Sequence, residues 1–141
     1  MKMNKYVVFI IITCIINVLV GQDTLIDELS QNAHKYYYQK DYANAIILFE
    51  NLLAKQELIF DQNDMHIAET LTRLGELYSL SNMPEISTYY FEEAIIILEK
   101  SFEKNKKDLE SPLMSLLKIH SFNKNDLMKN NIQNQLNSIT N

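Results

Sequence analysis

The chain contains 141 residues, a length typical of one domain, and only two glycines and two prolines. An all-β fold needs turn-forming residues about every 8–12 positions, so this composition predicts the all-α class. The formal net charge of −5 argues against a general nucleic-acid binder, which usually presents a basic face, and we expect no nucleic-acid partner.

Residues 1–21 have the pattern of a secretory signal peptide. Lys2 and Lys5 make the start basic, the apolar run VVFIIITCIINVLV follows, and Gly21 precedes a polar stretch. We therefore predict cleavage after Gly21 and a secreted or periplasmic location for the mature domain, residues 22–141. The alternative is an uncleaved anchor that holds the chain at a membrane, although the run is shorter than the roughly 20 residues that span a bilayer.

Cleavage after Gly21 would also remove Cys14, the single cysteine of the chain. An exported domain without cysteine has no disulfide bonds, so it must fold by packing alone. A domain of about 120 residues is large enough to do so.

The predicted mature domain repeats itself at an interval of 42 residues. Internal repetition at such a period is typical of stacked-repeat architectures. The residues that this interval brings into register are Tyr36 with Tyr78, Phe49 with Phe91, Leu71 with Leu113, and Leu74 with Leu116. The three predicted repeats cover approximately residues 23–60, 65–104 and 107–139.

Each repeat consists of two predicted helices joined by a short turn. In the second repeat, the apolar residues of the first helix lie three or four positions apart, which is the spacing of one helical face: Ile67, Leu71, Leu74 and Tyr78. Pro84 suits the first turn of the next helix and Asn82 its N-terminal cap, and Asp41 is the predicted cap in the first repeat. The other predicted helices cover residues 23–39, 42–59, 108–120 and 125–139.

The spacing of small and large residues resembles the tetratricopeptide repeat. The second repeat contains Leu71-x2-Leu74-Gly75-x2-Tyr78 followed by Ser87-x3-Phe91-x2-Ala94, and the first has Ala33 in the place of Gly75. In this family small residues recur where two helices cross, so we expect Gly75 to be structural. The interval of 42 residues resembles the kinesin-light-chain variant of the repeat.

This resemblance implies a short α-solenoid of about three antiparallel helix pairs. The third pair is degenerate, because Lys129 and Gln133 stand where the family has a small residue and an aromatic one. We interpret the Asn- and Gln-rich residues 123–141 as a polar capping pair, which solenoids need for solubility. A partly disordered tail is the alternative.

The sequence offers little for catalysis. It contains no H-E-x-x-H, no glycine-rich phosphate loop and no G-x-S-x-G, and its histidines, His34, His66 and His120, are scattered. We therefore expect no enzyme, no cofactor and no metal site. An enzyme would instead require a pocket that unites His34 with acidic residues of the neighbouring repeat.

The resemblance also implies a concave groove on the first helix of each pair, where tetratricopeptide proteins bind peptide segments of their partners. Adjacent side chains on a helix point about 100° apart, so Tyr36 takes the packing position and Tyr37 and Tyr38 fall toward the groove. The groove residues by this pattern are Asp27, Ser30, His34, Tyr37 and Tyr38, then Glu69, Thr72, Glu76 and Ser79, then Met114 and Lys118.

This aromatic and acidic surface predicts a protein or peptide partner that carries lysine or arginine and one apolar anchor. The alternative is that Tyr37 packs against the neighbouring loop and the acidic residues are merely solvated. We expect a non-catalytic scaffold for protein–protein interaction, inclined to form a homo-oligomer because so few repeats are near the minimum for stability. Its rivals are a membrane-anchored sensor or assembly subunit held by an uncleaved N-terminal helix, and a vestigial relative of longer repeat proteins.

Overall fold

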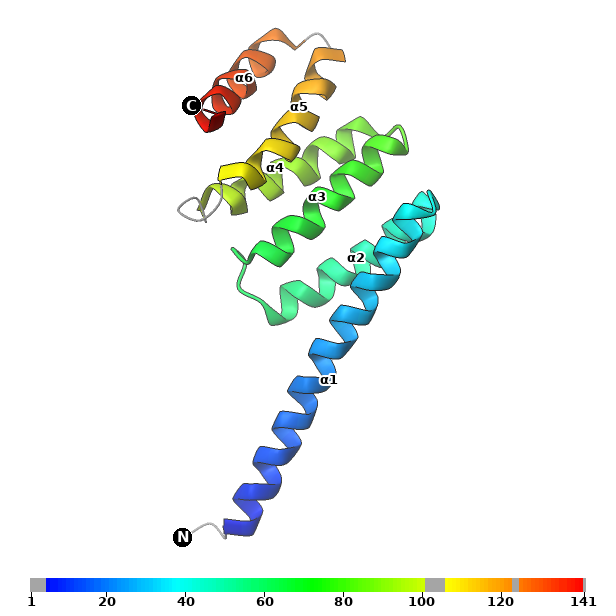
Figure 1. Cartoon of the computed structure of the whole chain (residues 1–141), viewed down its shortest axis with the longest axis vertical. Helices are drawn as coiled ribbons and strands as arrows, with labels where there is room; N and C mark the ends of the chain where they lie inside the picture. Colours follow the sequence, from blue (N-terminus) through cyan, green and yellow to red (C-terminus); the bar gives the residue numbers. More distant parts are fainter. Residues whose placement is uncertain (1–4, 101–105, 123–124, 141) are drawn as a thin grey trace.

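The computed structural model describes residues 5–100, 106–122 and 125–140. These residues form seven helices that pack in chain order as antiparallel pairs (Figure 1), which confirms the all-α class. The helices are α1 (Lys5–Tyr38), α2 (Tyr42–Ile59), α3 (Met65–Leu80), α4 (Pro84–Lys100), the short 3₁₀ helix η1 (Lys106–Leu109), α5 (Glu110–Phe122) and α6 (Asp126–Thr140).

The turns α1–α2, α3–α4 and α5–α6 share one backbone hydrogen bond. In each turn, the N–H group just before the second helix donates to the carbonyl five residues earlier, at 2.9 to 3.0 Å. These bonds join Asp41 to Tyr36, Met83 to Tyr78 and Asn125 to His120. Successive bonds are 42 residues apart, so the interval of the sequence repeat is also the interval of the turns.

Two of these turns hold a residue other than glycine in the left-handed backbone region: Lys40, with a φ of 61°, and Asn82, with a φ of 59°. The N–H of Asn82 donates to the carbonyl of Ser79 at 3.1 Å, which completes the Schellman motif that closes a helix C-terminus. Asn82 therefore ends α3. The prediction that Asn82 caps the N-terminus of α4 is wrong, because α4 begins at Pro84 and the residue directly before it is Met83.

The other predicted features of the helix starts are confirmed. Asp41 caps α2, since its Oδ1 accepts a hydrogen bond of 3.3 Å from the N–H of Asn44. Pro84 is the first residue of α4, where its missing N–H leaves no helical hydrogen bond unmade. α3 begins at Met65, just before the predicted stripe of apolar residues.

α1 is longer than the sequence predicts. It begins at Lys5 and passes through Gly21 without interruption, so residues 5–21 of the predicted signal segment and the first helix of the first pair belong to one helix of 34 residues. A glycine inside a helix costs about 1 kcal/mol relative to alanine, which is too little to end a long helix. Figure 1 shows the N-terminal part of α1 projecting beyond the other helices.

The projecting part of α1 exposes a row of apolar side chains. They are Tyr6, Val7, Phe9, Ile10, Ile11, Ile12, Ile15 and Ile16. Within the described ranges, no helix combines the length and the apolarity that crossing a membrane requires. Cleavage after Gly21 and a secreted or periplasmic location stay predictions.

α3 and α4 approach each other closely at Gly75, as the sequence predicts. A Cβ atom at Gly75 would lie 2.8 Å from both Cδ1 and Cε1 of Phe91, a separation that packed carbon atoms do not adopt. Phe91 is fully buried, so its ring has no free space into which to withdraw. The glycine is therefore a packing residue.

Two apolar cores hold the helices together. One contains Phe49 and lies among α1, α2 and α3, and the other contains Phe91 and extends from α3 to α6. Partly buried side chains contact both cores: Leu53, Phe60 and Tyr90. The two cores therefore form one continuous interior.

The C-terminal tail is helical from Asp126 to Thr140. α6 buries Ile132 and Leu136 in the core around Phe91, and Nε2 of Gln135 donates to Oε1 of Glu99 in α4 at 3.2 Å. The end of the second predicted repeat, residues 101–104, lies outside the described residues, as do residues 123, 124 and 141.

Candidate binding groove

The first helices of the pairs, α1, α3 and α5, carry the predicted groove residues. One cleft opens between α3 and the segment formed by η1 and the start of α5, and a smaller cavity lies where α1, α2 and α3 meet. His66, Glu69 and Arg73 of α3 line both of them. α3 is therefore the central element of the candidate groove.

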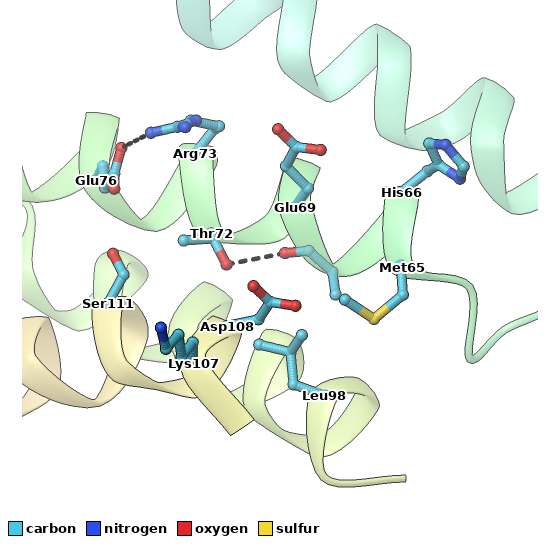
Figure 2. A pocket seen from close by; sticks show the side chains of 11 residues that line it. Met65, His66, Glu69, Thr72, Arg73, Glu76, Leu98, Lys107, Asp108 and Ser111 are labelled. Carbon is cyan, nitrogen blue, oxygen red and sulfur yellow. Dashed lines mark hydrogen bonds and ion pairs between the residues drawn. The ribbon is translucent and has the colours of Figure 1, made fainter. Parts of the chain in front are cut away.

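The larger cleft has a volume of about 460 Å³ (Figure 2). Three predicted groove residues of α3 line it: Glu69, Thr72 and Glu76. Figure 2 shows Lys107, Asp108 and Ser111 on the opposite side, and the structure thereby brings residues of the second and third pairs together.

Carboxylates outnumber permanent cations in this larger cleft. The cleft is lined by three carboxylates, Glu69, Glu76 and Asp108, and by two cations, Arg73 and Lys107. Glu76 is paired, because its Oε2 lies 2.9 Å from Nη1 of Arg73. Among the described residues Glu69 and Asp108 form no ion pair, so the cleft keeps a negative character.

The smaller cavity has a volume of about 90 Å³. Asp27, Ser30 and His34 line it from α1, and Glu69 lines it from α3. The imidazole of His34 is fixed, since Nδ1 donates to the carbonyl of Ser30 at 2.9 Å and the ring meets Phe49 edge to face at 5.0 Å. Four of the predicted groove residues therefore converge on one cavity.

Tyr37 joins α1 to α3 and is half-buried. Its hydroxyl donates to Oε2 of Glu76 at 3.2 Å, and Cζ of Arg73 lies 5.8 Å from the centre of its ring. The carboxylate of Glu76 thus accepts from a tyrosine of one pair and an arginine of the next. Because Tyr37 contacts α3 directly, its side chain contributes more to the junction between the first and second helix pairs than to an exposed aromatic surface.

The pKa values of this cluster follow from its geometry. Burial raises the pKa of Tyr37, and the nearby negative charge and hydrogen bond of Glu76 raise it further. Burial alone would lower the pKa of Arg73, but the hydrogen bond and charge of Glu76 outweigh burial, so that pKa is raised. Both residues therefore keep their protons at neutral pH.

The remaining predicted groove residues line neither cleft. Tyr38 is 74% exposed near the end of α1, with its ring centre 5.5 Å from that of Tyr37. Lys118 and Met114 are exposed on α5, and Ser79 is exposed near the end of α3. These positions border the groove face without converging on a cavity.

The predicted groove omitted several residues that line the clefts, among them Arg73 and Gln56. Arg73, the only arginine of the chain, lies four residues after Glu69 and three before Glu76, so its helical spacing was a sufficient signal. Gln56 of α2 lines the smaller cavity and is 5% exposed. It continues the buried stripe of Phe49 and Leu52, and a polar residue on an apolar stripe is the signal that could have found it.

The described residues contain no group of three or more histidine, cysteine, aspartate or glutamate side chains that could hold a metal ion. His34 and Glu69 do line one cavity, which is the convergence that a catalytic site would require. The ring nitrogen Nδ1 of His34 is bonded to the Ser30 carbonyl.

No protein-family model matches the chain, and a search of curated proteins finds no match. The resemblance to the tetratricopeptide repeat therefore rests on the residues of this chain alone.

Proposed function

We propose that the chain is a short tetratricopeptide-like solenoid, a non-catalytic scaffold that binds a segment of a partner protein in the groove along α1, α3 and α5. The observation that carries this proposal is one helical hairpin occurring three times, with closing hydrogen bonds 42 residues apart. Ala33 and Gly75, both buried, supply the small residues at the first two helix crossings. Stacked repeats of this kind present concave surfaces that suit protein binding.

The charge of the groove supports a basic partner segment. Asp27, Glu69 and Asp108 line the clefts and form no ion pair with another described residue. Lysine or arginine in the partner would complement them, which increases the rate and fixes the register of association. Met65 and Leu98 line the larger cleft and offer apolar surface to one anchoring side chain of the partner.

The proposed location of the scaffold is outside the cytoplasm, and this part rests on residues 1–21. It is tested by determining the N-terminal residue of the protein purified from its native source. A mature chain that begins near Gln22 supports export with cleavage. Retention of residues 5–21 contradicts cleavage.

A second candidate is a sensor or assembly subunit attached to a membrane surface by the uncleaved N-terminal part of α1. The row of exposed apolar residues between Tyr6 and Ile16 favours it, because isolated apolar helices of this kind need a covering surface. Flotation of the whole chain with phospholipid vesicles tests this candidate. Replacement of Phe9 and Ile12 by serine should abolish flotation if the row is an anchor.

The groove is tested by selecting peptides from a random displayed library with the whole chain, then measuring Kd by calorimetry. We expect selected peptides to be rich in lysine or arginine and to contain one apolar residue. Glu69→Lys should weaken their binding at least tenfold, because Glu69 lines both clefts. Glu92→Lys is the matched control, since Glu92 is exposed on α4 and lines neither cleft.

Two results would contradict the proposal. Selected peptides without basic residues would contradict the predicted partner. Loss of binding in Glu92→Lys but not in Glu69→Lys would place the binding surface on the second helices. Circular dichroism of both variants establishes that a loss of binding is not a loss of fold.

A further inference from the structure

The smaller cavity between α1, α2 and α3 contains an unsatisfied hydrogen-bond acceptor. Gln56 is 5% exposed and lines this cavity, and its Oε1 has no hydrogen-bond partner among the described residues. A buried acceptor without a partner costs about 1–3 kcal/mol. Such an atom requires a donor from outside the chain, which a water molecule or a ligand group can supply.

The cavity around Gln56 offers further acceptors. Nδ1 of His34 donates to a carbonyl oxygen, and Nδ1 of His66 lies 2.7 Å from Oδ1 of Asp64. Carbonyl and carboxylate oxygens only accept, so Nδ1 is the donor in both rings and, in the neutral form, Nε2 is an acceptor. The carboxylates of Asp27 and Glu69 line the same cavity.

We propose that this cavity binds the primary ammonium group of a lysine side chain in the partner segment. This inference rests on the proposed function of the groove and adds the identity of one partner residue. An ammonium group has three N–H donors and no acceptor, which matches a lining of Gln56, imidazole nitrogens and carboxylates. Its positive charge also matches the unpaired carboxylates of Asp27 and Glu69.

The size and the walls of the cavity fit one such side chain. A volume of about 90 Å³ exceeds what a single water needs and is below the range of pockets for whole small molecules. Ile26, Phe49 and Leu52 form apolar walls that suit the methylene chain of lysine. Arg73 also lines the cavity, and its guanidinium is held by Glu76, whose Oε2 lies 2.9 Å from Nη1.

The test is a titration of the isotopically labelled whole chain, followed by NMR, with two blocked tripeptides, acetyl-Gly-Lys-Gly-amide and acetyl-Gly-norleucine-Gly-amide. The two differ by the ammonium group at the end of the same methylene chain. We expect saturable shifts of the Gln56 side-chain amide and the Phe49 ring with the lysine peptide alone. Equal shifts with both peptides, or none with either, would overturn the proposal.

Two variants test the acceptor of Gln56 and the charge of Glu69 separately. Gln56→Met keeps the length of the side chain but removes the acceptor, and it should weaken binding of the lysine peptide about tenfold or more. Glu69→Gln should weaken it as well and provides a second test if Gln56→Met does not fold. Gln62→Met, at an exposed position in the loop after α2, should leave the affinity unchanged. Unchanged affinity in both Gln56→Met and Glu69→Gln would overturn the assignment.

A third probe separates a lysine residue from a free amine. n-Butylamine carries the same four-carbon chain and a single ammonium group, without a peptide backbone. If it binds more tightly than the lysine peptide, the assignment to a partner residue is wrong. The tripeptides test the cavity alone, whereas the library selection tests the whole groove. If the cavity binds the lysine peptide but the selection yields no groove ligand, the proposed function is wrong and the ammonium site is still supported.

Discussion

The hydroxyl of Ser87 in α4 donates a hydrogen bond of 2.7 Å to the backbone carbonyl of Gly75 in α3. Ser87 is fully buried, so the bond satisfies a polar group at the closest crossing of the two helices. The ring of Phe91 covers the same glycine from the next turn of α4. At this separation, position 75 of α3 can carry the hydrogen atom of glycine but not the methyl group of alanine.

Gly75→Ala should therefore destabilise the protein. Alanine favours the helix by about 1 kcal/mol, but the overlap with Phe91 costs about 1–3 kcal/mol, so we expect a net loss of up to about 2 kcal/mol. Urea denaturation followed by circular dichroism measures the change.

Gly21→Ala is the matched control for this substitution, since Gly21 is the other glycine of the chain and also lies in a helix. No atom lies within 4 Å of the position that its Cβ would occupy. Alanine there should be neutral or should stabilise by up to about 1 kcal/mol. Equal responses at the two glycines would contradict the role of Gly75 in packing.

Lys40→Gly should stabilise the protein. Lys40 has a φ of 61°, a conformation that costs a side chain with a Cβ about 1–2 kcal/mol and costs glycine very little. The loss of entropy on ordering glycine reduces the gain, so we expect an increase of about 0.5–1 kcal/mol in the free energy of unfolding.

The corresponding change Asn82→Gly should give a smaller increase, because asparagine tolerates this conformation better. Lys35→Gly, within α1, should instead destabilise by about 1 kcal/mol, and thermal unfolding distinguishes the three.

The ion pair of Arg73 and Glu76 should be coupled to Tyr37. A double-mutant cycle of Arg73→Met and Tyr37→Phe, measured by urea denaturation, should give a coupling energy of about 0.5–1 kcal/mol. The physical reason is that both groups bind the same carboxylate, so removal of one changes the hydrogen bond that the other makes. Additive single effects would contradict the cluster. Arg73→Met with Tyr38→Phe is the control cycle and should be additive.

Stability should fall as the pH rises above about 10. The pKa values of Tyr37, Tyr78 and Tyr90 are raised, with burial as the largest cause in each. An unfolded tyrosine has a pKa of about 10, so the folded protein holds these protons more tightly than the unfolded chain. Their contribution is complete below about pH 10 and is lost as the pH rises through the folded pKa values.

The same prediction has a sharper form at Tyr78. Its hydroxyl donates to Oε1 of Glu50 at 2.6 Å, and its ring stacks on Tyr90 with 5.4 Å between centres. Tyr78→Phe should therefore flatten the decline in stability above about pH 10. Glu50→Gln should allow Tyr78 to ionise at lower pH than in the parent protein, as measured by tyrosinate absorbance. A decline that is unchanged in Tyr78→Phe would assign it to other groups.

The sequence predicted most of the fold because its signals are local. Pro84, Asp41 and the apolar stripes depend on neighbours within one or two helical turns, and the bounds of α2 agree with the prediction. The cap at Asn82 was mistaken because asparagine suits both an N-terminal cap and a left-handed helix end, and the two roles are one residue apart. The predicted start of α1 was wrong because the apolar residues of a signal pattern can also form a helix.

The candidate groove was less accessible to prediction. The face of α3 followed from helical spacing, and Glu69, Thr72 and Glu76 do lie together. The burial of Tyr37 against Glu76 depends on how closely α1 approaches α3, which no local pattern encodes. The unpaired oxygen of Gln56 depends on three helices meeting, so it could be found only in the structure.

The unbroken course of α1 through Gly21 has a consequence for the order of events during biogenesis. Peptide bonds inside a formed helix are poor targets for proteolysis, which concentrates at exposed, unstructured segments. A peptidase that cuts after Gly21 must therefore act before α1 closes as a single helix. Once the segment from Lys5 to Tyr38 has formed its helix, that bond would be protected, so cleavage, if it takes place, would have to precede folding of α1.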